Sequence, residues 1–116
     1  MITIYHNPRC TKSREGLSEI ENSNKSFNIR KYLDEPFTKV ELKEVIKKLD
    51  IKPLELVRTK ESIWIENYKG KQLTDEEIID ALFLHPKLIE RPILVFDNKA
   101  IIGRPKEKIK KFLQQF

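Results

Sequence analysis

The sequence has a single cysteine, Cys10, and only two histidines among its 116 residues. One cysteine excludes an internal disulfide, and so few cysteine and histidine ligands argue against a structural zinc site. With three glycines and six prolines, the chain does not have the composition of a fibrous or disordered protein. The longest apolar runs, such as residues 92–96, are far shorter than the roughly 20 residues of a membrane-spanning helix. These absences predict one small globular domain, residues 1–116, without a membrane span or a structural metal. No bound cofactor is expected.

The charge of the chain is positive, with 23 Lys and Arg residues against 18 Asp and Glu residues and a net charge of +5. This excess favours anionic partners, which include nucleic acids, membrane headgroups and small oxyanions. In the basic run at residues 106–111, Glu107 and the helical apolar spacing favour a solvated helix face over a nucleic-acid site. The first residues lack the layout of a signal peptide, so we expect a cytoplasmic protein whose lone cysteine stays reduced.

The order of the expected elements is strand, helix, strand, a helical middle, two strands and a helix. Alternating residues at 2–5 predict the first strand, a helix follows Cys10, and a second strand is expected over about 27–33. Two capping boxes, Thr38 with Glu41 and Thr74 with Glu77, mark the starts of two helices. Residues 93–96 and 100–102 flank a polar turn and predict a hairpin before a C-terminal helix. The pattern indicates an α/β sheet with a helical segment inserted at about residues 38–90.

Cys10 lies at the junction between the turn after the first strand and the following helix. Open backbone N–H groups and the helix dipole favour an anion there, so the thiol is expected to ionise more readily than a free cysteine. Ser13 and Arg14 follow at helical spacing and could supply a hydroxyl hydrogen bond and a positive charge. An inert buried cysteine is the alternative, but the polar and basic residues at 7–14 favour a reactive one. Because Ser13 stands in the second place of a Cys-x-x-Cys motif, any reductant must come from outside.

Four separated segments resemble the glutathione/glutaredoxin-coupled arsenate reductase family: YHNPRCTKSR at 5–14, LVR at 56–58, HPKLIERPILV at 85–95 and IGRP at 102–105. The resemblance covers nearly the whole chain. It implies a thioredoxin-like, glutaredoxin-type sheet with an inserted helical segment, in agreement with the element order. The single cysteine and the end of the chain at Phe116 resemble the short branch of that family.

The resemblance also implies an oxyanion site made of one nucleophilic thiol and three arginines. The thiol corresponds to Cys10, and the arginines correspond to Arg58, Arg91 and Arg104. Guanidinium groups suit an oxyanion because they keep their charge and present paired donors.

Other positions match the parts of the family pattern that support the cysteine. His6 and Asn7 fall at the positions that flank and tune it, and Ser13 and Arg14 are expected to assist. Pro92 matches a cis-proline next to the active site.

The function implied by the resemblance is reduction of arsenate to arsenite by the Cys10 thiolate. Glutathione would be a co-substrate and glutaredoxin the protein partner. Two alternatives remain open. One is a non-catalytic module similar to the Spx regulators, which contact RNA polymerase and whose redox-sensing members usually carry a second cysteine where this chain has Ser13. The other is a thiol reductase of a different substrate.

Overall fold

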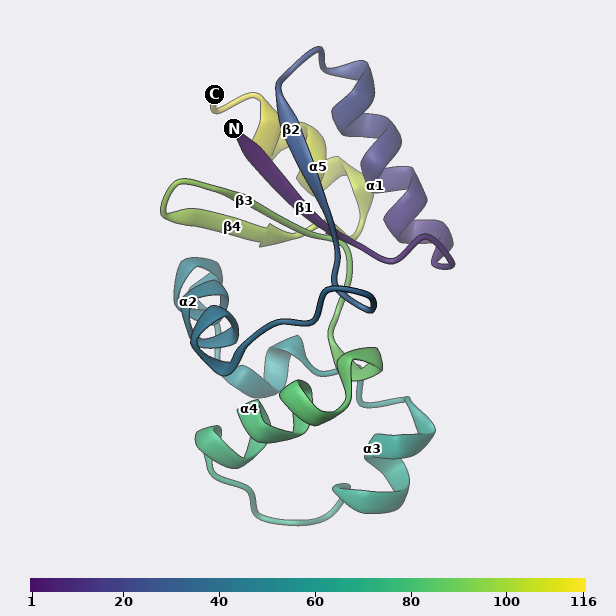
Figure 1. Cartoon of the computed structure of the whole chain (residues 1–116), viewed down its shortest axis with the longest axis vertical. Coiled ribbons are helices and arrows are strands. Elements are labelled where there is room, and N and C mark those ends of the chain that lie inside the picture. The colour runs from purple at the N-terminus through teal and green to yellow at the C-terminus, as the bar shows by residue number, and fades with distance from the viewer. The chain divides into compact units, whose positions relative to one another are not determined.

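The computed structural model describes all 116 residues, and the contacts of the chain divide it into two compact units. The first unit contains residues 1–35 and 91–116, and the second contains residues 36–90. In Figure 1 the first unit is a sheet with two helices, and the second consists of helices joined by loops.

The first unit contains one four-stranded sheet. Its elements are β1 (Ile2–His6), α1 (Thr11–Asn22), β2 (Phe27–Lys31), β3 (Ile93–Phe96), β4 (Lys99–Ile102) and α5 (Lys106–Leu113). The strand order is β2-β1-β3-β4, in which β1 runs parallel to β2 and antiparallel to β3, and β3 and β4 form the expected hairpin. Because β1 is an inner strand, the loop that follows it leaves from the middle of the sheet rather than from an edge.

Helices α1 and α5 pack against each other and cover the same face of this sheet (Figure 1). Successive side chains of a strand point to opposite faces, so Ile2 and Ile4 of β1 share one face, together with Leu94 of β3. Ile20 of α1 and Ile109 of α5 join them in one buried cluster. The buried residues of both helices therefore share one core on this face of the sheet.

Strand β2 ends at Lys31, two residues before the expected end near Leu33. Lys31 pairs with His6, the last residue of β1, so no strand partner continues beyond that point. The carbonyl oxygen of Lys31 instead accepts hydrogen bonds from the N–H groups of Asp34 and Glu35, which close a turn. The shorter strand follows from the length of its neighbour.

The second unit is built from short helices. They are α2 (Lys39–Leu49), the 3-10 helix η1 (Pro53–Leu56), α3 (Ser62–Asn67), α4 (Asp75–Leu84) and the 3-10 helix η2 (Pro86–Leu88). Both expected capping boxes are present, at Thr38 with Glu41 and at Thr74 with Glu77. Two ion pairs link α2 to α4: Lys39 to Asp80 at 2.8 Å and Lys43 to Glu76 at 3.1 Å.

Trp64 of α3 and Tyr68, which follows α3, pack within this unit. The rings of Trp64 and Tyr68 stack with centroids 5.1 Å apart, and Tyr68 also contacts the ring of His85 edge-on. These contacts are of the kind that stabilise a small helical layer.

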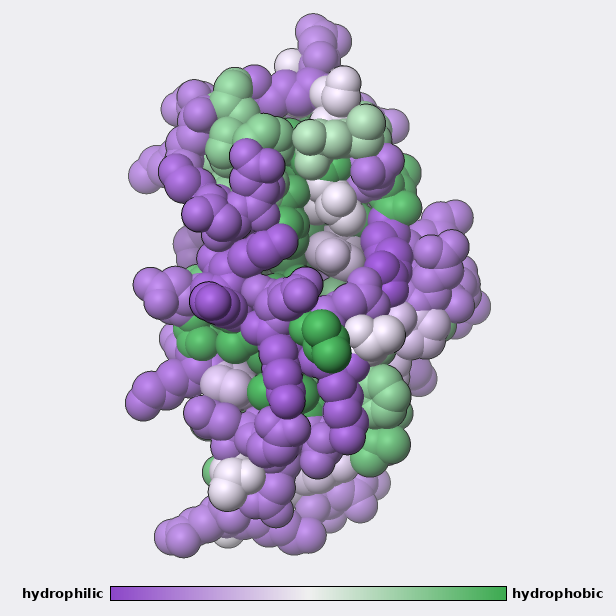
Figure 2. Space-filling model, turned by 60° about the vertical axis from the view of Figure 1, so that its left-hand side comes forward, coloured by the Kyte–Doolittle hydropathy of each residue, from purple (hydrophilic) through white to green (hydrophobic).

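The face of the molecule shown in Figure 2 is largely hydrophilic, with hydrophobic residues exposed in places between the polar ones. No helix of the protein has both the length and the apolar character needed to cross a bilayer.

Close packing in the first unit depends on Gly16 of α1. A Cβ atom at this position would lie 2.8 Å from Cγ of Pro92 and 3.0 Å from Cδ1 of Ile109. Both distances are shorter than ordinary van der Waals contact, so a methyl group would have to displace the proline ring or the isoleucine. Gly16 therefore lets α1 lie directly against the residue that precedes β3.

We predict that Gly16→Ala destabilises the protein by about 1–3 kcal/mol, because overpacking outweighs the gain in helix propensity. Denaturant or thermal unfolding measures the change. Ser18→Ala, an exposed position on the same helix, is the matched control and should leave stability nearly unchanged or slightly raised. Equal stability of the wild type and Gly16→Ala would contradict the packing argument.

Candidate active site

Cys10 is the N-cap residue of α1, in the loop that follows the inner strand β1. Its backbone is extended, with φ −95° and ψ 121°, and its side chain makes no capping hydrogen bond. The Cys10 N–H donates to the Asn7 carbonyl at 3.0 Å, and the Cys10 carbonyl accepts from the Arg14 N–H at 3.0 Å. These bonds hold a partly exposed thiol at the positive end of a helix, where an anion is stabilised.

Ser13 has a different role from the one that the sequence predicts. Its side chain is fully buried, and its Oγ lies 2.7 Å from Nδ1 of His6 while accepting a hydrogen bond from the Asn7 N–H at 3.0 Å. The hydroxyl is therefore engaged below the loop, and Ser13 acts on the thiol through its backbone N–H, which helps to lower the pKa of Cys10. The prediction that the Ser13 hydroxyl donates a hydrogen bond to Cys10 is wrong, because this hydroxyl is the partner of buried polar atoms of His6 and Asn7.

Asn7 stabilises the loop from within. Its side chain is buried, and its Oδ1 accepts a hydrogen bond from the Arg9 N–H at 3.0 Å. An asparagine that bonds to the backbone two residues further on is a common turn former. Asn7 thus bonds to the loop through its carbonyl, its N–H and its side chain.

Arg14 fastens the outer side of the same loop. Its Nη1 donates to the Pro8 carbonyl at 2.9 Å, and its Nη2 donates to Oγ1 of Thr11 at 3.2 Å. The sequence predicts a supporting charge at Arg14. The structure adds that the guanidinium spans the loop on both sides of Cys10, a contact that side-chain spacing alone does not reveal.

The pKa of Cys10 is held below its usual value. Burial of the thiol acts to raise the pKa, but this is outweighed by the backbone N–H of Ser13, by the side-chain donors and positive charge of Arg91, and by the backbone N–H of Lys12. Each of these groups favours the thiolate over the thiol. The thiolate is the nucleophilic form of cysteine, so the lowered pKa increases the reactive fraction of Cys10 at a given pH.

The pKa of His6 is lowered, first by burial and then by the positive charges of Lys31 and Arg14, while the hydrogen bond with Ser13 acts in the opposite direction. Lys31 is the register partner of His6 on β2, which explains its influence. The imidazole is therefore neutral at pH 7. His6 contributes a hydrogen-bonding group to the base of the loop rather than a positive charge.

Arg91 and Arg104 each precede a proline, and both peptide bonds, Arg91-Pro92 and Arg104-Pro105, are cis. The cis bond at Pro92 is expected from the family resemblance and is present, whereas the one at Pro105 is not predicted by the sequence. The Gly103 N–H donates to the Pro92 carbonyl at 2.8 Å, which joins the two Arg-Pro segments. Arg91 and Arg104 are thereby brought onto neighbouring backbone segments of the first unit.

Arg58 belongs to the second unit. There its Nη1 lies 3.0 Å from Oε1 of Glu61, and its N–H donates to the Leu88 carbonyl at 2.7 Å. Sequence reasoning selects Arg58 only through the family pattern and overlooks Glu61, although spacing of three residues is a recognisable signal for an ion pair.

The groups around Cys10 suit an anion rather than a metal ion. Backbone N–H groups and the Arg91 guanidinium donate towards the thiol. No group of three or more His, Cys, Asp or Glu side chains is placed to hold a metal ion anywhere in the chain. Such a donor set favours a small oxyanion beside the thiolate.

Comparison with known proteins gives the site its context. The profile of the ArsC family matches residues 5–112. The chain belongs to the ArsC family. It is 39% identical over 114 residues to the arsenate reductase of Haemophilus influenzae, covering 97% of this chain and 98% of that protein. It is also 40% identical over 110 residues to the uncharacterized protein YfgD of Escherichia coli K12, covering 93% of this chain and 92% of that one.

A solved structure gives the same result for this ArsC family member. The arsenate reductase from Vibrio cholerae superposes with a TM-score of 0.90 at 39% sequence identity, covering 95% of each chain. The fold is thioredoxin-like, as the resemblance in the sequence implies.

We predict that the rate of Cys10 alkylation by iodoacetamide, measured against pH, gives an apparent pKa below that of free cysteine. Arg91→Ala should raise this pKa, because it removes a hydrogen bond and a positive charge from the thiolate. Arg91→Lys should restore only part of the shift. Lys99→Ala, which removes an exposed charge from β4, is the control. An apparent pKa at or above the free-cysteine value in the wild type would contradict the activated thiolate.

We also predict that His6 makes the fold sensitive to acid. Its pKa is lower in the folded than in the unfolded state, so the unfolded chain binds the proton more strongly. Its contribution to stability is complete above about pH 6.5, the usual value for histidine, and is lost as the pH falls through the folded value. Urea unfolding of the wild type and His6→Gln across this range measures the difference. An unchanged slope of stability with pH in the variant would contradict the buried neutral imidazole.

Proposed function

We propose that this protein reduces arsenate to arsenite, with Cys10 as the nucleophile, glutathione as the co-substrate and glutaredoxin as the protein partner. The observation that carries the proposal is the Cys10 thiol at the N-terminus of α1, with its pKa lowered by the Ser13 N–H and the Arg91 side chain against the effect of burial. Membership of the ArsC family and the names of its full-length relatives support the choice of arsenate.

The first step in the proposed reaction is attack of the Cys10 thiolate on arsenic(V). An S–As bond forms and an As–O bond breaks, and the departing oxygen takes up protons and leaves as water. Arg91 and Arg104 would neutralise the charge on the remaining arsenate oxygens. Planar guanidinium groups match a tetrahedral oxyanion because each can donate two hydrogen bonds.

The second step requires a thiol from outside, because the chain has one cysteine. The glutathione thiolate attacks Sγ of Cys10, and the S–As bond breaks with its electron pair remaining on arsenic. Arsenic is reduced from As(V) to As(III) and leaves as arsenite, while the two sulfur atoms are oxidised to a Cys10–glutathione disulfide. A glutaredoxin thiolate then attacks the glutathione sulfur and releases the Cys10 thiolate.

We predict that the purified protein oxidises NADPH in the presence of arsenate, glutathione, glutaredoxin and glutathione reductase. Cys10→Ser should abolish this activity. Arg91→Ala and Arg104→Ala should each lower the affinity for arsenate about tenfold or more, since a lost charged hydrogen bond costs about 1.5–3 kcal/mol. Arg14→Ala should have a smaller effect, because Arg14 bonds to the loop. Lys99→Ala is the matched control for the loss of one positive charge.

A binding measurement separates the enzyme from the alternative of a non-catalytic binding module. Arsenate, sulfate or phosphate at millimolar concentration should protect Cys10 from alkylation and raise the melting temperature, since a ligand of the folded state stabilises it. Arg91→Ala and Arg104→Ala should lose this protection while remaining folded. Absence of both protection and turnover in the wild type would contradict the arsenate reductase proposal.

A further inference from the structure

A cavity opens beside the Cys10 loop, between α1 and the start of α5. Its volume is about 300 Å³, and it is lined by Thr11, Arg14, Glu15, Ser18, Glu19 and Lys106. It begins at Thr11, the residue after Cys10, and on the other side at Lys106, which follows the Arg104-Pro105 segment. All of these residues belong to the first unit. The cavity therefore begins at the residue next to Cys10 but is lined by residues that the proposed oxyanion site does not use as ligands.

Charges of both signs line this cavity. Arg14 and Lys106 supply positive charge, and Glu15 and Glu19 supply negative charge. Arg14 donates to the loop, and Glu15 lies 3.6 Å from Lys12 in a partly exposed pair. No ion pair joins either cation of the cavity to either of its two acids. A ligand that carries both an ammonium group and carboxylates would offer partners to both sets of charges.

The size of the cavity suits a short peptide. Residues 11 and 19 of α1 are separated by about 12 Å along the helix at 1.5 Å per residue. An extended tripeptide is about 10 Å long at roughly 3.5 Å per residue. Small-molecule sites in proteins begin at about 300 Å³. A peptide of about three residues therefore matches both the length and the volume.

We propose that this cavity binds one arm of the peptide thiol that resolves the Cys10 adduct. The ligand class is a short zwitterionic peptide with a thiol near its middle, and glutathione is the probe. Arg14 and Lys106 bind a carboxylate of the peptide, and Glu15 and Glu19 of α1 bind its ammonium group. The inference rests on the proposed function, because only a single-cysteine catalyst needs an external thiol at this place.

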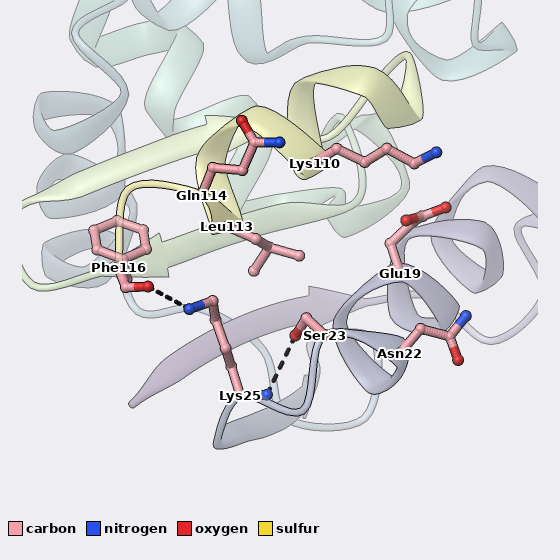
Figure 3. Close-up of a pocket in the computed structure, with 8 residues that line it drawn as sticks. All are labelled: Glu19, Asn22, Ser23, Lys25, Lys110, Leu113, Gln114 and Phe116. Atoms are coloured by element: carbon pink, nitrogen blue, oxygen red, sulfur yellow. Dashed lines mark hydrogen bonds between the residues drawn. The ribbon is translucent and has the colours of Figure 1, made fainter.

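A second cavity provides an internal control. It lies at the C-terminal ends of α1 and α5 and has a volume of about 480 Å³. Glu19 lines both cavities. Figure 3 shows the side chains of Lys110 on α5 and Glu19 on α1 at its two sides. The Lys25 side chain donates to the terminal carbonyl oxygen of Phe116 in the same cavity. A variant of Lys110 therefore tests whether removing a positive charge elsewhere on α5 has the same effect as removing the charge of Lys106.

The experiment measures formation of a mixed disulfide on Cys10, followed by mass spectrometry. The Cys10 thiolate attacks one sulfur of glutathione disulfide, the S–S bond breaks, and one glutathione thiolate leaves. The same measurement with 2-hydroxyethyl disulfide, which is neutral, gives the intrinsic reactivity of Cys10. The ratio of the two rate constants isolates recognition of the charged peptide from the chemistry of the thiol.

We expect Lys106→Ala to lower the rate with glutathione disulfide about two- to fivefold, the usual effect of one exposed ion pair, and to leave the neutral disulfide unaffected. Lys106→Glu should lower it further. Lys108→Ala, on the same helix but outside both cavities, and Lys110→Ala, in the second cavity, should change the ratio much less. Melting temperatures confirm that each variant is folded.

Equal effects of Lys106→Ala, Lys108→Ala and Lys110→Ala would overturn the proposal, because the rate would then depend only on the total positive charge of α5. An equal loss of rate with both disulfides would also overturn it, because the change would then lie in the thiol. The measurement involves no arsenate, so the two proposals fail separately. A protein that reduces arsenate without preferring glutathione disulfide would contradict the cavity assignment, and one with this preference but no arsenate turnover would contradict only the proposed function.

Discussion

The buried hydroxyl of Ser13 joins the end of β1 to the first turn of α1, and the geometry of the site depends on this junction. It contacts Nδ1 of His6 and accepts from the Asn7 N–H, so strand, loop and helix share one polar group. A buried hydroxyl without partners would be costly, and here its contacts are made only when the loop has its observed shape. Cys10 belongs to that loop, so the hydrogen bonds of the Ser13 hydroxyl with His6 and Asn7 help to fix the position of the thiol.

The electrostatics of the site have a simple division of roles. His6 remains neutral, which allows it to be buried under the loop without an unpaired charge. Arg91 supplies the positive charge that acts on the Cys10 thiol. The thiolate is thus stabilised by a guanidinium group, while the imidazole beneath the loop adds no charge.

Local signals in the sequence account for the parts of the site that lie close together in the chain. The turn at Asn7, the start of a helix after Cys10 and the anion-stabilising position of the thiol all depend on residues within about four positions of each other. The error at Ser13 arises at the next level. Spacing places its side chain near the thiol, but the hydroxyl is taken by His6, seven residues away on the preceding strand. Helical spacing alone does not show that a side chain has a competing hydrogen-bond partner on another strand or helix.

The sequence by itself determined the element order, both capping boxes, the helical segment between the second and third strands, and the place of the single thiol at the start of a helix. These features depend on periodicity and on hydrogen bonds within single elements, which the chain specifies locally. Only the tertiary structure decided the contact of Gly16 with Pro92, the joining of the Pro92 and Gly103 backbones and the cavity between α1 and Lys106. Each brings together residues more than ten positions apart, and such contacts form only when the sheet and its two helices pack as a whole.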